Sequence, residues 1–156
     1  MVKVVPKVII MDSYVEDPES WMLRCEIAEK ADSSLLHEMM GDEHWGVRRE
    51  VAKRIPVDRL SEMMGDEFWE VRREVAKRID PSRLHEMMSD PEWTVRREVA
   101  KRVPPDRLPE LMGDPDWWTR RIVAQRIGSQ FLVPMLLRED VGPTIEIITK
   151  RLKTGG

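Results

Sequence analysis

The sequence of 156 residues has no asparagine, one cysteine and no long apolar run. Each of these features excludes a class of protein. A single cysteine, Cys25, excludes an internal disulfide framework and a metal cluster ligated by several cysteines. We expect Cys25, on a predicted helix, to be a small buried apolar residue rather than a reactive thiol. No stretch approaches the roughly 18 apolar residues of a membrane span. We therefore expect a soluble, cytoplasmic protein that binds neither a membrane nor a metal.

What the sequence does contain is a copied unit of 24 residues. The run VRREVAKRI at residues 47–55 returns unchanged at residues 71–79 and as VRREVAKRV at residues 95–103. A fixed period of this size indicates a stacked repeat architecture in which atypical outer units close the ends. The units begin at Leu36, Leu60, Leu84, Leu108 and Leu132, and an early half-copy occupies residues 17–31.

The repeats predict one domain over residues 1–156. The apolar start, Val2–Met11, lacks a signal-peptide cleavage site, so we expect it to cover the open end of a stack. The predicted parts are an N-terminal cap at 1–16, helical repeats at 17–131 and a divergent C-terminal capping repeat at 132–156.

Each unit has signals for one α-helix and one shorter helical segment. Asp-Glu or Asp-Pro before the VRR run favours a helix start, as at Asp42, and a proline such as Pro56 ends the helix. The remainder, such as Asp58–Met64, is long enough for one or two turns, and tight turns of this kind often take 3-10 geometry. The pattern predicts an all-α fold of alternating long and short helices.

The frame DPxWxVRxxVAxR, followed by PxxL, resembles the leucine-rich repeat variant family from about Asp17 to Leu132. The resemblance implies a right-handed α-solenoid of 24-residue repeats that alternate an α-helix with a short 3-10 helix. The family's founding member is associated with an iron–sulfur cluster held by several cysteines, which a chain with only Cys25 does not provide. An ordinary leucine-rich repeat of roughly 20–29 residues would need a strand and an asparagine or cysteine ladder, and the sequence has neither.

One arginine of each unit falls on the apolar face of its predicted helix. At about 100° per residue, Arg48 projects beside Ala52 and Ile55. Burying a guanidinium without a partner is costly, so each copy needs a fixed acceptor. An aspartate stands six residues before four of the five arginines, and Pro18 takes that position before Arg24. The same step occurs in HEAT repeats, where it implies a ladder between neighbouring units; the rival interpretation is a row that recognises an anion. Pairing forward gives Arg24–Asp42, Arg48–Asp66, Arg72–Asp90 and Arg96–Asp114, with Arg120 left for Glu139, Asp140 or solvent.

A second basic row projects away from the apolar face, with glutamates between its members. Glu50 and Arg54 form a favourable i,i+4 pair, so an internal network of ion pairs is one interpretation of this exposed arc. The other is a surface for a partner, and its candidate residues are Arg49, Arg73, Arg97, Arg121, Lys53, Lys77 and Lys101.

Tryptophan recurs with the same period. The simpler interpretation is packing at the edge of the core, and the alternative is an exposed aromatic row for a partner. The last four tryptophans each lie four residues before an arginine, so a guanidinium can stack over each indole. The column consists of Trp21, Trp45, Trp69, Trp93 and Trp117.

The sequence favours a non-catalytic interaction or scaffold module for a protein or peptide partner. The alternative is a nucleic-acid-binding repeat protein that places the Arg and Lys rows on phosphates, although a net charge of −3 argues against it. His37, His44 and His85 are scattered, and no metal-ligand spacing or phosphate-binding loop occurs. We therefore expect neither enzymatic activity nor a cofactor.

Overall fold

The computed structural model of the chain describes residues 20–138 and 142–155, and within these ranges it contains helices and no strand. The predicted cap at 1–16 lies outside the described residues. The chain divides into two compact units, the first ending at Pro56 and the second beginning at Val57.

The first unit is a small helical assembly in which α2 packs along α4, and α3 and η1 pack against α4. Its core is formed by small and branched side chains, among them Ala28, Leu36 and Val51, all nearly or fully buried. Its elements are α2 (Ser20–Lys30), α3 (Ser33–Glu38), the 3-10 helix η1 (Met39–Gly41) and α4 (Trp45–Arg54).

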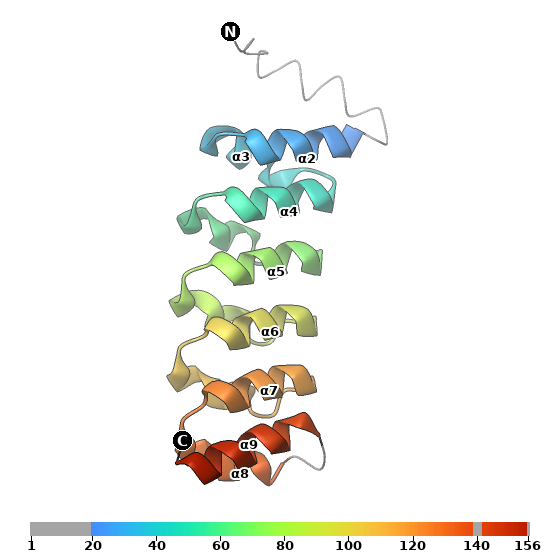
Figure 1. Cartoon of the computed structure of the whole chain (residues 1–156). Coiled ribbons are helices and arrows are strands. Elements are labelled where there is room, and N and C mark those ends of the chain that lie inside the picture. Colours follow the sequence, from blue (N-terminus) through green and yellow to red (C-terminus); the bar gives the residue numbers. More distant parts are fainter. Residues whose placement is uncertain (1–19, 139–141, 156) are drawn as a thin grey trace. The chain divides into compact units, whose positions relative to one another are not determined.

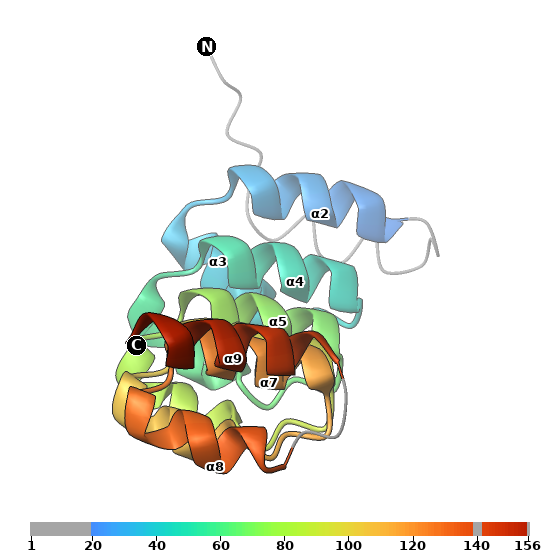
Figure 2. The ribbon, with the colours of Figure 1, turned by 60° about the horizontal axis from the view of Figure 1, so that its bottom comes forward.

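The second unit stacks its long helices in chain order, with α5 on α6, α6 on α7 and α7 on α9 (Figure 1). The 3-10 helices form a second layer, and α8 lies on their side in Figure 2. The elements are η2 (Val57–Met63), α5 (Trp69–Arg78), η3 (Pro81–Met87), α6 (Trp93–Arg102), η4 (Pro105–Leu111), α7 (Trp117–Arg126), η5 (Ser129–Phe131), α8 (Leu132–Leu136) and α9 (Pro143–Thr154).

The apolar positions of the repeat explain the stacking. In α5, Val71, Val75 and Ala76 are fully buried, because they face the adjacent helix and the 3-10 layer. The 3-10 helix that follows contributes Leu84 and Met87 to the same core. The predicted all-α solenoid, in which an α-helix alternates with a 3-10 helix, is confirmed.

The predicted helix start at the aspartate is wrong by three residues: α4 begins at Trp45 rather than Asp42, and the later helices begin at the equivalent tryptophans. The carboxylate instead accepts a backbone N–H two residues ahead, as in Asp90 Oδ1 with the amide of Glu92 at 2.9 Å. This side-chain bond folds the turn that precedes the helix, and it leaves the carboxylate free to accept from another repeat.

Candidate interaction surface

The carboxylates of these turn aspartates accept hydrogen bonds from arginines of the preceding repeat. Nε and Nη2 of Arg72 donate to the two carboxylate oxygens of Asp90 at 2.7 and 2.9 Å. Arg96 makes the same fork with Asp114 at 2.7 and 3.0 Å. In the first unit Arg24 reaches Asp42 at 2.8 and 3.1 Å. A bidentate fork of this kind is the strongest form of arginine–carboxylate contact.

The remaining nitrogen of each ladder arginine bonds backward to its own repeat. Nη1 of Arg72 donates to the backbone oxygen of Asp66 at 2.7 Å, and Nη1 of Arg96 donates to that of Asp90 at 2.8 Å. Arg120, whose predicted acid partners lie outside the described residues, still bonds the backbone oxygen of Asp114 at 2.8 Å. The guanidiniums of Arg72 and Arg96 thus each tie two successive turns together.

Electrostatics in the ladder favour the charged arginine. The hydrogen bond to Asp114 raises the pKa of Arg96, and the hydrogen bond to Asp90 raises that of Arg72, against the opposing effect of burial. Arg48 and Asp66 belong to different units, and their pairing stays a prediction. Arg48 itself is buried and donates to the backbone oxygen of Asp42 at 2.7 Å.

A second arginine contact, which the sequence reasoning missed, is made by arginines in the last turn of four long helices. Arg102 Nη1 and Nη2 donate to the backbone oxygens of Ala76 and Ile79 at 2.7 and 2.8 Å. The helical projection placed the equivalent Arg54 on the exposed arc, but it donates to the oxygen of Ala28 at 2.5 Å. The last carbonyls of a helix have no partner within that helix and carry its negative dipole end, so a cation from the next helix stabilises them. The arginines that make this second contact in the two units are Arg54, Arg102, Arg126 and Arg151.

The glutamates predicted on the exposed arc are also largely buried. The side chains of Glu74 and Glu98 are 8% and 10% exposed. Each accepts from the lysine three residues later, Lys77 at 2.7 Å and Lys101 at 2.9 Å. In the first unit Glu50 accepts from Lys53 at 2.6 Å rather than pairing with Arg54. The lysines of the basic row are therefore neutralised within their own helices.

The arginines of the basic row do not all have the same surroundings. Arg49 lies 3.9 Å from Glu50, and Arg73 Nη2 lies 3.7 Å from Glu98 of the next repeat. The fourth repeat replaces the glutamate of this position by Ile122. Among the described residues, the guanidiniums of Arg97 and Arg121 have no carboxylate within 4 Å and make no side-chain hydrogen bond.

Indole rings, rather than carboxylates, lie beside these two arginines. The guanidinium carbon of Arg97 lies 5.1 Å from the ring centroids of both Trp93 and Trp118, and that of Arg121 lies 5.2 Å from Trp118. Trp118 stacks on Trp117 with centroids 4.2 Å apart. We call these five residues of α6 and α7 the Trp–Arg cluster.

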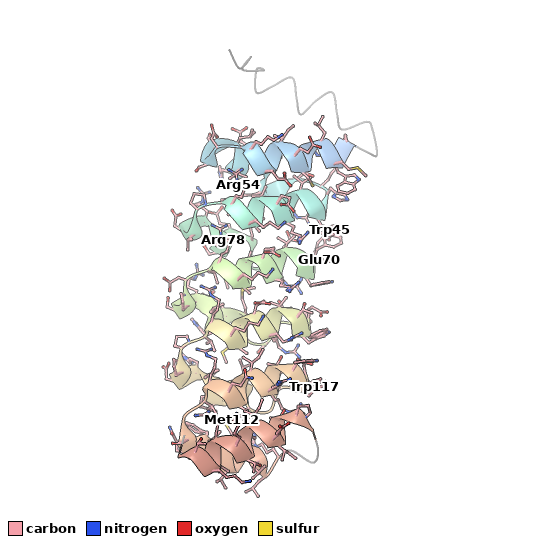
Figure 3. The ribbon with its side chains drawn as sticks, in the orientation of Figure 1. Trp45, Arg54, Glu70, Arg78, Met112 and Trp117 are labelled. Carbon is pink, nitrogen blue, oxygen red and sulfur yellow. The ribbon has the colours of Figure 1, made fainter. Side chains whose placement is uncertain are left out.

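Exposure divides the tryptophan column. Trp69 in α5 is half-buried, as the simpler interpretation expected, whereas Trp93 and Trp117 are 41% and 38% exposed. Trp118, which lies beside the column, is 37% exposed. Figure 3 shows Trp117 at the beginning of α7, on the same side of the second unit as Glu70 at the beginning of α5. Exposed indoles beside uncompensated arginines have the composition of a protein interface hot spot.

Other features of the described ranges offer less chemistry. A hollow of about 460 Å³ beside Asp90 and Asp114 is lined by carboxylates that already hold Arg72 and Arg96. Across residues 20–138 and 142–155 no group of three or more His, Cys, Asp or Glu side chains is placed to hold a metal ion. Burial raises the pKa of the Cys25 thiol, which disfavours the reactive thiolate. None of the helices in these ranges has the length and apolarity needed to span a bilayer.

The regular units and their paired ladders define a helical repeat protein. The model of the family described as leucine rich repeat variant matches residues 93–116. A solved structure described as a leucine-rich repeat variant with a novel repetitive protein structural motif is 35% identical, with a TM-score of 0.77. That similarity covers 86% of this chain and 57% of the other. No curated protein matches the sequence. The predicted resemblance to the leucine-rich repeat variant family is confirmed.

Proposed function

We propose that the chain is a non-catalytic interaction module that binds a protein or peptide partner through the solvent-facing side of its long helices. The observation that carries this proposal is the Trp–Arg cluster, where three indoles are exposed and two guanidiniums have no acid partner among the described residues. Stacked repeats present an extended surface suited to such a partner. The ladder residues, in contrast, have their hydrogen-bonding groups occupied by neighbouring repeats.

A nucleic-acid partner is the alternative function. Arginine and tryptophan together support it, because bases stack on indoles and phosphates pair with guanidiniums. It is the weaker proposal because buried glutamates already hold the lysines, including Lys77 and Lys101. The residues that it would use are Arg49, Arg73, Arg97, Arg121, Lys53, Lys77 and Lys101.

The absence of enzymatic activity and of a cofactor is part of the same proposal. The arginine–aspartate ladder and the second arginine contact join successive repeats, and the lysine–glutamate pairs lie within single helices, so all three are structural uses of charge. The tryptophans and arginines of the cluster supply contact area and positive charge, which serve binding.

Capture from a lysate of the source organism tests the proposal. The immobilised chain and its Arg97→Glu, Arg121→Glu variant are compared, each with and without nuclease treatment. We expect a protein that the native chain retains after nuclease and that the variant loses. A retained set that disappears with nuclease would favour the nucleic-acid alternative, and equal capture by both chains would remove the cluster from the proposal.

A further inference from the structure

We propose that the Trp–Arg cluster binds a carboxylate of an acidic, extended peptide, with Arg97 and Arg121 pairing with the acid and the indoles covering its apolar neighbours. This inference rests on the proposed function and narrows its partner to one chemistry. Three observations carry it: the local charge, the unmet hydrogen-bond donors and the short length of the exposed patch.

Successive repeats differ in the charge that surrounds the arginine of the basic row. Arg73 faces Glu98 of the following helix, with 3.7 Å between Nη2 and Oε1. The residue one repeat after Glu98 is Ile122, so Arg97 lacks the acid that Arg73 has. Gln125 in turn replaces the lysine of that repeat. The fourth repeat therefore lacks the glutamate–lysine pair of the other repeats. Arg97 in α6 and Arg121 in α7 are left without a nearby carboxylate among the described residues.

The ring contacts do not satisfy the N–H donors of the two arginines. An indole face attracts a guanidinium through its π electrons but accepts none of its in-plane N–H bonds well. Nε of Arg97 is buried without a hydrogen-bond partner among the described residues, and so is Nε of Arg73. The two arginines differ at their terminal nitrogens, since Nη2 of Arg73 lies 3.7 Å from Glu98 and Arg97 has no carboxylate within 4 Å among the described residues. A carboxylate approaching the terminal nitrogens Nη1 and Nη2 supplies two acceptors in a fork geometry that arginine matches well.

The positively charged patch is short, which favours a peptide acid over a long polyanion. Both uncompensated arginines contact one ring, Trp118, at 5.1 and 5.2 Å, so the positive charge is confined to one place. Further along the row, the buried carboxylates of Glu74 and Glu98 compensate the cations beside them. A nucleic-acid backbone needs several successive phosphate contacts, whereas one or two peptide carboxylates need only this patch. The exposed indoles then provide apolar area beside the charge.

The probe is a fluorescein-labelled short peptide that alternates glutamate with phenylalanine, and its control carries glutamine in place of every glutamate. Fluorescence anisotropy measures binding to the full chain. We expect the acidic peptide to bind at least about tenfold more tightly than the glutamine peptide, with an affinity that falls as salt rises.

Variants locate the site. Arg97→Gln combined with Arg121→Gln should weaken binding of the acidic peptide about tenfold or more, because both charged donors are lost. Ile122→Glu should weaken it as strongly with both arginines present, since the new acid takes the place that Glu98 has beside Arg73. The charge-matched control, Arg83→Gln with Arg107→Gln, removes two exposed cations from the 3-10 layer and should change binding less than about twofold. Thermal unfolding midpoints show that each variant is folded.

Binding that survives the Arg97, Arg121 double substitution overturns the inference, as does equal binding of the glutamine peptide or no binding at millimolar acidic peptide. A short oligothymidylate that binds more tightly than the acidic peptide and is lost with the same variant also overturns it. The proposed function is tested separately, because the lysate experiment detects a protein partner of any chemistry.

Discussion

Breaking one buried rung of the ladder should cost far more stability than breaking an exposed ion pair in the same repeat. The perturbation is Asp114→Asn, which keeps the shape of the side chain and an oxygen for the backbone N–H of Asp116, now 2.8 Å away. It removes the charge that Arg96 faces, and an amide nitrogen then opposes one of the arginine donors. The Asp114 side chain is 2% exposed and that of Arg96 is 10% exposed, so water cannot replace the lost partner.

The expected loss follows from this burial. Removing one partner of a buried ion pair costs about 3–5 kcal/mol of unfolding free energy. Because Asp114→Asn keeps the bond to the backbone N–H of Asp116, we expect a loss of about 3 kcal/mol. Glu110→Gln is the matched control, because Glu110 pairs with Arg107 at 3.0 Å with both side chains about half exposed. Exposed pairs of this kind contribute below about 1 kcal/mol.

Urea unfolding followed by helical circular dichroism measures both variants. The dependence of the unfolding free energy on urea must stay unchanged for the comparison to hold, since a stacked repeat can lose cooperativity. A double-mutant cycle with Arg96→Gln should give a coupling energy of about 1 kcal/mol or more if the two side chains stabilise each other. Equal losses from Asp114→Asn and Glu110→Gln, or a coupling energy near zero, would refute the structural role of the rung.

Two further predictions concern the second arginine contact and the cysteine. Arg126→Gln should destabilise the chain by about 1–3 kcal/mol, because the backbone oxygens of Ala100 and Val103 lose a charged donor; an unfolding midpoint equal to that of the native chain would contradict this. Cys25 should react with iodoacetamide at pH 8 more slowly in the native chain than in urea, because burial raises its pKa and its thiolate fraction is therefore lower. Mass spectrometry follows that reaction, and equal rates in both states would show an accessible, ordinary thiol.

The fold was predictable because the repeat carries its own boundaries. The 24-residue period, the proline stops and the apolar positions such as Val71 and Val75 specify one long helix and one short helix per unit. The helix start was not predictable from the same signals. An aspartate can cap a helix or fold an Asx turn, and the choice at Asp90 depends on Arg72, which approaches from the preceding repeat.

Surface positions were harder to predict than the core, because a projection of one helix omits the next helix. Arg54 projects toward solvent, yet a long side chain can reach the end of a neighbouring helix, and its guanidinium bonds the oxygen of Ala28. Glu98 likewise becomes buried through Lys101 and Arg73. One signal for the cluster was present in the sequence: Ile122 breaks the glutamate column where the chain has an additional tryptophan, Trp118.

Because the same two arginine contacts recur from repeat to repeat, a whole repeat of the chain can be removed or added without breaking them. Deleting the 24 residues Leu84–Arg107 would present Asp114 to Arg72 and the carbonyl of Ala76 to Arg126, so both connections would re-form without any new residue. The position now held by Arg97 would pass to Arg73, which would exchange its glutamate for the indole of Trp118. The contact between an arginine of this column and Trp118, at the junction of a regular and a divergent repeat, can therefore be kept while the array in front of it lengthens or shortens.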